Sequence, residues 1–519
     1  MSNFSPQVEI AAPVASPSVK ADHHITAAAK GGGILLGGKF FAYGTRFVIG
    51  ILLARFLAAE QYGLYNLSFA AVEIAAGLAA CGLGAALVRY IPIYRSRQDE
   101  NRLWGTIQIG LILPALVSLF LSIALYILAI PIAEQWFEEP KLAPLLQLVS
   151  PAIVFFTLVD MLAAATRGFK EMRYTVIAQD IVLSVVKLFL LFAMVLIGLT
   201  AARAITATSL TEMVVCGLLF FFLNKQFPLR RPLATGQREI GEIVRFSSPM
   251  YLADIIIKFS GNIKALLLGT LHNVASVGVF SVASQVTMIS DMFHSSIVTV
   301  SQPIISEISS RGDRNQLKSF YQTVSRWSLT LNFPLFLALL LFPGPIISIF
   351  GETFTNGIVV LKILAWTGLV NTGTGICGVL IDMSGNTRLK LVNTIISVTV
   401  SISLSFLMIP TWGLIGAAIA SLTSAIIINL LRLIEVFILF QLLPYNAIFL
   451  KPLTAGGIAF SLMWIASWFY PTVDLLHLIV SLPLLVAIYV GILLLLGLSE
   501  EDRLIVRRLR RRIENMLSR

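Results

Sequence analysis

Residues 103–130 read LWGTIQIGLILPALVSLFLSIALYILAI and contain no acidic or basic side chain. A helix of about 20 mostly apolar residues is long enough to cross the hydrocarbon core of a bilayer. Of the chain's 519 residues, 57% are hydrophobic and only 13% are charged, whereas soluble domains are about 25% charged. The mean hydropathy is +0.86. The sequence therefore predicts an integral membrane protein, because too few polar residues are present to cover soluble domains.

Similar apolar runs recur along the chain, and we expect an all-α polytopic membrane protein with about 14 transmembrane helices. Several runs exceed a minimal span, so tilted helices are expected. An even number of crossings places both termini on one side of the membrane. The expected spans lie near 33–57, 64–88, 103–130, 142–166, 174–199, 203–224, 246–271, 275–307, 320–343, 356–383, 388–409, 412–439, 448–470 and 475–497.

Basic side chains gather in alternate loops between these spans, which is the pattern of cytosolic loops. On this rule both termini are cytosolic, and the loops on the other side hold little more than Lys141 and Arg203. The net charge of +11 then reflects membrane topology, and no nucleic-acid partner is expected. The loops predicted to be cytosolic contain Arg89, Arg95, Arg97, Arg102, Arg167, Lys170, Arg173, Lys225, Arg230, Arg231, Arg238, Arg245, Arg311, Arg314, Lys318, Arg388 and Lys390.

Two short motifs recur at nearly the same offset, which indicates an internal repeat. YGLYNLS at 62–68 matches VGVFSVA at 277–283, an offset of 215 residues from 62 to 277. GFKEMR at 168–173 matches GNTRLK at 385–390, an offset of 217 residues from 168 to 385. We therefore expect two copies of a six-helix unit, related by a pseudo-two-fold axis along the membrane normal.

The repeat divides the chain into six parts. The last of them carries apolar residues at helical spacing among arginines, which is typical of a helix lying on anionic lipid; a tail that only sets topology fits the same residues. We expect a disordered cytosolic tail at 1–30, an N-terminal six-helix bundle at 31–224, a cytosolic linker at 225–243, a C-terminal six-helix bundle at 244–440, two extra transmembrane helices at 441–497, and a basic amphipathic cytosolic tail at 498–519.

Motifs in both halves resemble those of a known family. LARFL at 53–57 with EQYGLYN at 60–66 resembles the first-loop signature of bacterial polysaccharide repeat-unit flippases, in the multidrug/oligosaccharidyl-lipid/polysaccharide exporter superfamily. VGVFS at 277–281 and IDMSGN at 381–386 resemble the second-half counterparts. The resemblance covers roughly residues 30–497 and implies two six-helix bundles around a central cavity, plus two extra helices.

The resemblance also implies a function. An undecaprenyl-pyrophosphate-linked oligosaccharide would cross the bacterial plasma (inner) membrane by alternating access, for surface or exopolysaccharide biosynthesis. Membrane lipids, a polysaccharide polymerase and export machinery would be its partners. A peptidoglycan-precursor flippase and a cation-coupled multidrug exporter of the same superfamily are the alternatives.

An enzyme is not expected. The chain has no G-x-x-x-x-G-K-[ST] loop for binding nucleotide phosphates. A membrane-embedded glycan polymerase usually carries a large outside loop, and the longest here, around 131–141, has eleven residues. We expect no cofactor, and coupling to an H+ or Na+ gradient is a hypothesis.

Basic residues inside the predicted spans are the first candidates for a site, because a charge at a helix centre costs about 2.5–3.5 kcal/mol and so faces protein or water. Lys39, Tyr43 and Arg46 share one face of the first span. Lys258 and Lys264 lie in the seventh. A pyrophosphate needs cations part-way across the bilayer, and arginine matches its oxygens bidentately. These five residues are the candidate pyrophosphate and sugar site, although Lys39 could instead snorkel to the surface.

Acidic residues within the spans suggest a second role. Glu73, Asp254, Asp291 and His294 are candidates for ion coupling, because a buried carboxylate can carry a proton. Charge compensation is the alternative, with Asp254 paired to Lys258 and Glu73 paired to Arg46.

The remaining polar residues give weaker signals. Asp160, Asp382 and Glu435 fall near predicted helix ends and are assigned to the membrane interface. The three cysteines, Cys81, Cys216 and Cys377, lie in apolar runs, so neither a disulfide framework nor a metal site is expected.

Overall fold

The structure is a computed structural model that describes residues 17–229, 232, 236–237, 239–383, 387–469, 475–497, 499 and 502. These residues are helical almost throughout and include no β-strand. The helices are α1 (Pro17–Ala79), α2 (Leu83–Ser96), α3 (Glu100–Pro131), α4 (Leu142–Val149), α5 (Ala152–Gly168), α6 (Met172–Thr175), α7 (Leu183–Leu196), α8 (Ala201–Gln226), α9 (Ile240–Leu271), α10 (Val274–Arg311), α11 (Arg314–Leu341), α12 (Pro343–Ser348), α13 (Ile358–Gly373), α14 (Cys377–Met383), α15 (Thr387–Phe440), α16 (Leu450–Phe469) and α17 (Leu475–Leu495).

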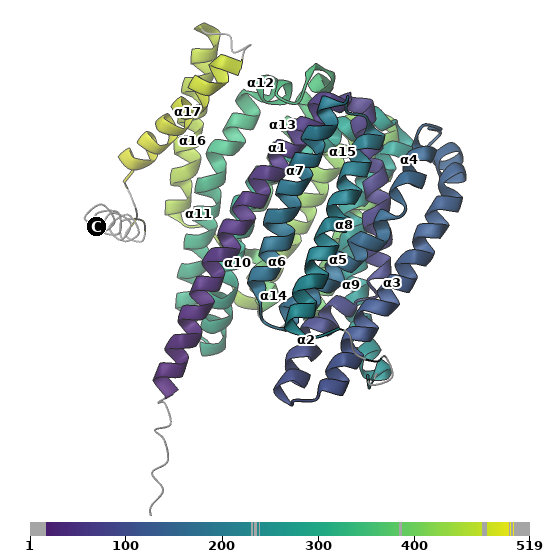
Figure 1. Ribbon diagram of the computed structural model, residues 1–519. Coiled ribbons are helices and arrows are strands. Elements are labelled where there is room, and N and C mark those ends of the chain that lie inside the picture. Colours follow the sequence, from purple (N-terminus) through teal and green to yellow (C-terminus); the bar gives the residue numbers. More distant parts are fainter. Residues whose placement is uncertain are drawn as a thin grey trace, which may run out of the picture.

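Two of these helices contain a reversal of the chain. Ala58 in α1 has φ 58° and ψ 174°, and Gly413 in α15 has φ 52° and ψ −127°. A positive φ is incompatible with a right-handed helix, so the helix is broken at each residue. Figure 1 shows α1 running the length of the bundle before the chain turns back. Each of α1 and α15 therefore supplies two spans.

The predicted polytopic fold is confirmed. Among the described residues, ten helices are long and apolar enough to cross a membrane, or eleven with the bent pair α4 and α5 taken as one span. That number counts α1 and α15 once each, although each joins two helices across a kink. The 32 residues of α9 are also long enough to span. Each predicted span thus coincides with helix in the structure.

The helices form two halves and an addition (Figure 1). We call α1–α8 the N-terminal half and α9–α15 the C-terminal half. Helix α1 packs on α10 more extensively than any other pair of described helices does, so these two helices hold the halves together. Helices α16 and α17 pack on each other and on α11, at the edge of the bundle. We call the face where α1 begins the N-terminal face, and the face at Ala58 the opposite face.

The two copies of the repeated motif meet at the opposite face. A side-chain carbon on Gly63 would overlap the carbonyl oxygen of Val274, and one on Gly278 would overlap the carbonyl oxygen of Ala59. Gly63 and Gly278 occupy equivalent positions of the repeat, and so do Ala59 and Val274. The contact is therefore reciprocal, as the predicted two-fold relation between the halves requires. Only glycine permits backbones to approach this closely.

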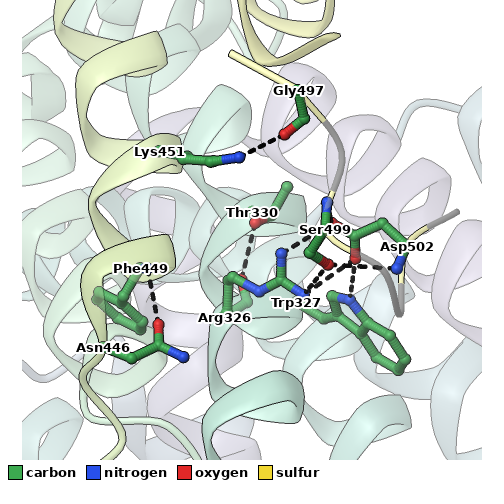
Figure 2. Close-up of polar contacts among 9 residues, drawn as sticks. All are labelled: Arg326, Trp327, Thr330, Asn446, Phe449, Lys451, Gly497, Ser499 and Asp502. Carbon is green, nitrogen blue, oxygen red and sulfur yellow. Dashed lines mark hydrogen bonds and ion pairs between the residues drawn. The ribbon is translucent and has the colours of Figure 1, made fainter.

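The chain beyond α17 is anchored to α11 (Figure 2). Arg326 is buried, with 5% of the residue exposed, and its guanidinium donates to both carboxylate oxygens of Asp502 at 2.7 and 3.1 Å. Trp327 Nε1 donates to the same carboxylate at 2.8 Å. Burial alone would raise the pKa of Asp502, but hydrogen bonds from Trp327, Arg326 and Ser499 outweigh it and hold that pKa below its usual value. This pair fixes the end of the two-helix addition against the C-terminal half.

The structure differs from the sequence prediction at the N-terminus. Helix α1 already begins at Pro17, within the segment 1–30 predicted to be disordered. Proline is favoured in the first turn of a helix, and the alanines that follow are strong helix formers, so local propensity explains the earlier start. Residues 1–16 and most of the predicted tail at 498–519 lie outside the described residues.

Candidate functional site

A first polar cavity lies between α9, α10, α13 and α15, close to Asn66 of α1. Its volume is about 410 Å³, and Lys264 and Asp291 line it together with Asn262 and Asn371. Lys264 forms no ion pair with any residue that the structure describes. A lysine without a carboxylate partner in a polar cavity can bind an anion.

A second cavity of about 630 Å³ lies toward the N-terminal face, between α2, α5 and α9. Arg89, Arg167, Asp160 and Lys258 line it. Lys258 Nζ lies 2.9 Å from Asp160 Oδ2. This ion pair joins α9 to α5, so it connects the two halves.

Lys258 and Glu73 contact residues that the sequence did not suggest as their partners. Lys258 pairs with Asp160, and the side chain of Asp254 lies outside the described residues. Glu73 accepts a hydrogen bond of 3.0 Å from Asn262 Nδ2, and Arg46 forms no ion pair with it. The expected pairing of Glu73 with Arg46 is therefore replaced by a contact of α1 with α9, and Lys258 has a partner on α5, because packing brings α1 and α5 close to α9.

Arg46 is exposed on α1 and forms no ion pair with a described residue. Glu212 of α8, 6% exposed, lies within electrostatic range of Arg46, Lys187, Asp160 and Glu73. Arg46 and Asp160, the partner of Lys258, are therefore both within electrostatic range of Glu212. Tyr43 lies one turn before Arg46 and is half-buried.

The backbone beside Arg46 is held by α10. Gln285 Nε2 donates to the carbonyl oxygens of Arg46 and Phe47 at 3.1 and 3.3 Å. Tyr62 donates to Gln285 Oε1 at 3.3 Å. These bonds fix the middle of α1 against the C-terminal half and so position Arg46.

The structure also bears on the three remaining predicted site residues, Lys39, Asp291 and His294. The side chain of Lys39 lies outside the described residues. Asp291 lines the first cavity with Lys264. His294, one turn along α10, instead contacts Ser328 at 2.8 Å and lines a third cavity. Asp291 and His294, three residues apart on α10, thus line two different cavities.

Sequence reasoning missed several cavity residues. Asp160, assigned to the interface, pairs with Lys258. Asp382, also assigned there, pairs with Lys390 at 3.0 Å beside the third cavity. Asn262 and Arg432 were not singled out. The available signal was their polarity, since asparagine and arginine within an apolar span are as informative as lysine.

Comparison with known proteins assigns the family. The profile of the family described as "Polysaccharide biosynthesis protein" matches residues 28–309. The chain belongs to this polysaccharide biosynthesis protein family. A second profile, MatE, matches residues 249–407. Among curated proteins, the "Probable low-salt glycan biosynthesis flippase Agl15" of Haloferax volcanii is 26% identical over 390 residues, which cover 74% of this chain and 78% of that protein.

Several solved structures have the same fold as this chain. The lipid II flippase MurJ in an inward closed conformation has a TM-score of 0.70 and 16% identity, covering 88% of this chain and 98% of that chain. An inward-facing multidrug resistance MATE family transporter of the MOP superfamily has a TM-score of 0.63 and 16% identity, covering 76% and 95%. A MOP superfamily transporter from Pyrococcus furiosus has a TM-score of 0.56 and 15% identity, covering 78% and 94%. The profile matches confirm the predicted family, and the likeness to these solved structures shows the fold alone.

Proposed function

We propose that this protein is a flippase for a lipid-linked oligosaccharide, with undecaprenyl pyrophosphate as the lipid carrier in a bacterial plasma membrane. The observation that carries the proposal is Lys264, a cation without a carboxylate partner among the described residues, in a polar cavity bordered by helices of both halves. Arg46, exposed and equally unpaired, adds a second cation on α1. Both suit a pyrophosphate that must pass the apolar core.

The reciprocal contact at Gly63 and Gly278 supports alternating access. The halves meet at the opposite face, whereas the cavity with Arg89 and Arg167 lies toward the N-terminal face. A substrate head group would enter from the N-terminal face while the opposite face is closed. Separation of the two glycine contacts would then release it on the other side.

The proposal includes a coupling hypothesis. Asp291 lines the same cavity as Lys264. A proton or Na+ bound to Asp291 would therefore weaken its electrostatic attraction for Lys264. His294 takes no part in this hypothesis, because it lines another cavity. A multidrug exporter with cationic substrates is disfavoured, since cations repel Arg46 and Lys264.

Arg46 provides the test. Arg46→Ala should leave membrane abundance unchanged and abolish export, while Arg46→Lys should keep partial export because it retains charge without the bidentate geometry. The measurement is surface polysaccharide in cells that lack the native protein. Normal export by Arg46→Ala would refute the proposal, and rescue by Arg46→Ala/Glu73→Ala would reduce Arg46 to a charge-compensating residue. Glu60→Gln, in an exposed pair with Lys141, is the control.

The proposal also fixes the orientation, with both termini in the cytosol. A cysteine at Gln135, exposed beyond α3, should react with an impermeant maleimide in intact cells. One at Ser309, near the end of α10, should react only after the membrane is opened. Labelling of position 309 in intact cells would reverse the orientation.

A further inference from the structure

The third cavity, about 380 Å³ in volume, lies within the C-terminal half between α10, α13, α14 and α15. Asn371 lines both this cavity and the first one, so the two adjoin. Helix α13 ends at Gly373, and the chain bends through Gly375 (φ 72°) before α14 begins. The cavity therefore has a broken helix on one wall, and irregular backbone at membrane depth occurs where it lines a cavity.

Asn393 gives this cavity a buried acceptor without a partner. Its side chain is 3% exposed, and Nδ2 donates to Glu435 Oε2 at 2.6 Å. Because a carboxylate only accepts, the amide orientation is fixed and Oδ1 is left over. Asn393 Oδ1 has no hydrogen-bond partner among the residues that the structure describes. Burying an acceptor unpaired costs about 1–3 kcal/mol, so a donor that reached this atom would be bound favourably.

The neighbouring asparagines are already paired. Asn429 Nδ2 donates to Asn371 Oδ1 at 2.8 Å, and Thr374 donates to Asn429 Oδ1 at 2.9 Å. These contacts join the end of α13 to α15 beside the cavity, and the hydrogen bond to Glu435 positions Asn393. Support of this kind is what a selective binding site needs.

Arg432 gives the same cavity a cation. It lines the wall and forms no ion pair with a residue in the described part of the chain. The other cation, Lys390, is paired with Asp382 at 3.0 Å. The cavity thus offers one free guanidinium, whose paired N–H groups match a carboxylate.

We propose that this cavity binds a sugar unit that carries an acidic group, within the glycan of the substrate. The inference rests on the proposed function and names the class of sugar that the carrier bears. A sugar hydroxyl would donate to Asn393 Oδ1, and the acidic group would pair with Arg432. The adjoining cavity with Lys264 would hold the pyrophosphate, so the glycan would lie in the C-terminal half.

Binding to the purified full chain tests the inference. The probes are farnesyl pyrophosphate, farnesyl-pyrophosphate-linked glucose and farnesyl-pyrophosphate-linked glucuronic acid, with affinities from isothermal titration calorimetry. The wild type should bind the glucuronyl probe about tenfold tighter than the glucosyl probe, because one charge-assisted contact is added. Arg432→Gln should bring that ratio to about one. Arg388→Gln, the same change at an exposed position outside the cavity, should keep it.

Asn393→Leu is a second test, since it keeps a side chain of similar size but removes the hydrogen-bond acceptor. It should weaken binding of both glycosylated probes at an unchanged melting temperature. Equal affinities for glucuronyl and glucosyl probes in the wild type, or a ratio unchanged by Arg432→Gln, would overturn the inference. Failure of the proposed function would give a different result from failure of this inference. In that case, binding of farnesyl pyrophosphate alone would not depend on Lys264.

Discussion

The two halves of this protein contact each other through equivalent residues, but the cavities that they form are not equivalent. At the opposite face, Gly63 meets Val274 as Gly278 meets Ala59. Away from that face, a cavity between the two halves contains the ion pair of Lys258 and Asp160. The C-terminal half has a cavity walled by asparagines.

This difference teaches how a duplicated fold can act on an asymmetric molecule. Contact between the halves at the opposite face requires only that two backbones approach closely, and a glycine at the equivalent position of each half permits this. A lipid-linked glycan has a charged end and a sugar end, so two identical cavities would leave one end unmatched. In the proposed mechanism, the symmetric contact would serve opening and closing, and the differing cavities would serve recognition of the two ends of the substrate.

The largest expected effect comes from breaking the symmetric contact. Gly63→Ala and Gly278→Ala each place a carbon against a backbone carbonyl that cannot move aside. We expect either variant to reduce export by at least about tenfold and to widen the distance between spin labels on α1 and α10 at the opposite face. Gly217→Ala, whose added carbon would have nothing within 4 Å, is the control. Normal export by one glycine variant and not by the other would show that the contact is not symmetric in function.

A smaller effect should come from the addition that only the C-terminal half carries. Asp502→Asn leaves Arg326, whose side chain is 7% exposed, without its counter-charge. Since Asp502 itself is 21% exposed, we expect a loss of about 2 kcal/mol, less than the 3–5 kcal/mol of a fully buried pair. The melting temperature in detergent should fall by several degrees. Glu60→Gln, which breaks an exposed pair with Lys141 in the N-terminal half, should change it little.

The smallest effect concerns pH. The pKa of Asp502 is lowered in the folded protein, so its contribution to stability is present above the unfolded pKa of about 3.9 and is lost as pH falls through the folded value. The difference in melting temperature between wild type and Asp502→Asn should be constant from pH 6 to 8. It should shrink below about pH 4. A difference that grows on acidification would contradict the ion pair.

The sequence predicted the spans, because each is one continuous apolar run, and it predicted the repeat, because each copy of a motif is a short continuous stretch that can be compared with the other. YGLYNLS and VGVFSVA predicted two equivalent positions, and the structure places them in contact. It could not predict that Lys258 pairs with Asp160, since the partner lies 98 residues away and depends on how α5 packs on α9. The unpaired oxygen of Asn393 could not be predicted from the sequence either, because a missing hydrogen-bond partner is known only once the neighbouring residues have been placed.

The reciprocal glycine contact also bears on how such a chain can arise and drift. Residue i of one half meeting residue j of the other, and j meeting i, is the geometry of a two-fold homodimer interface. A gene that encodes a self-associating six-helix protein would reproduce this interface when duplicated and fused. Afterwards each glycine is constrained by the opposite copy: a change at Gly63 must be accommodated at Val274, and one at Gly278 at Ala59. The two copies are therefore expected to change in step at this interface, while their cavities diverge independently.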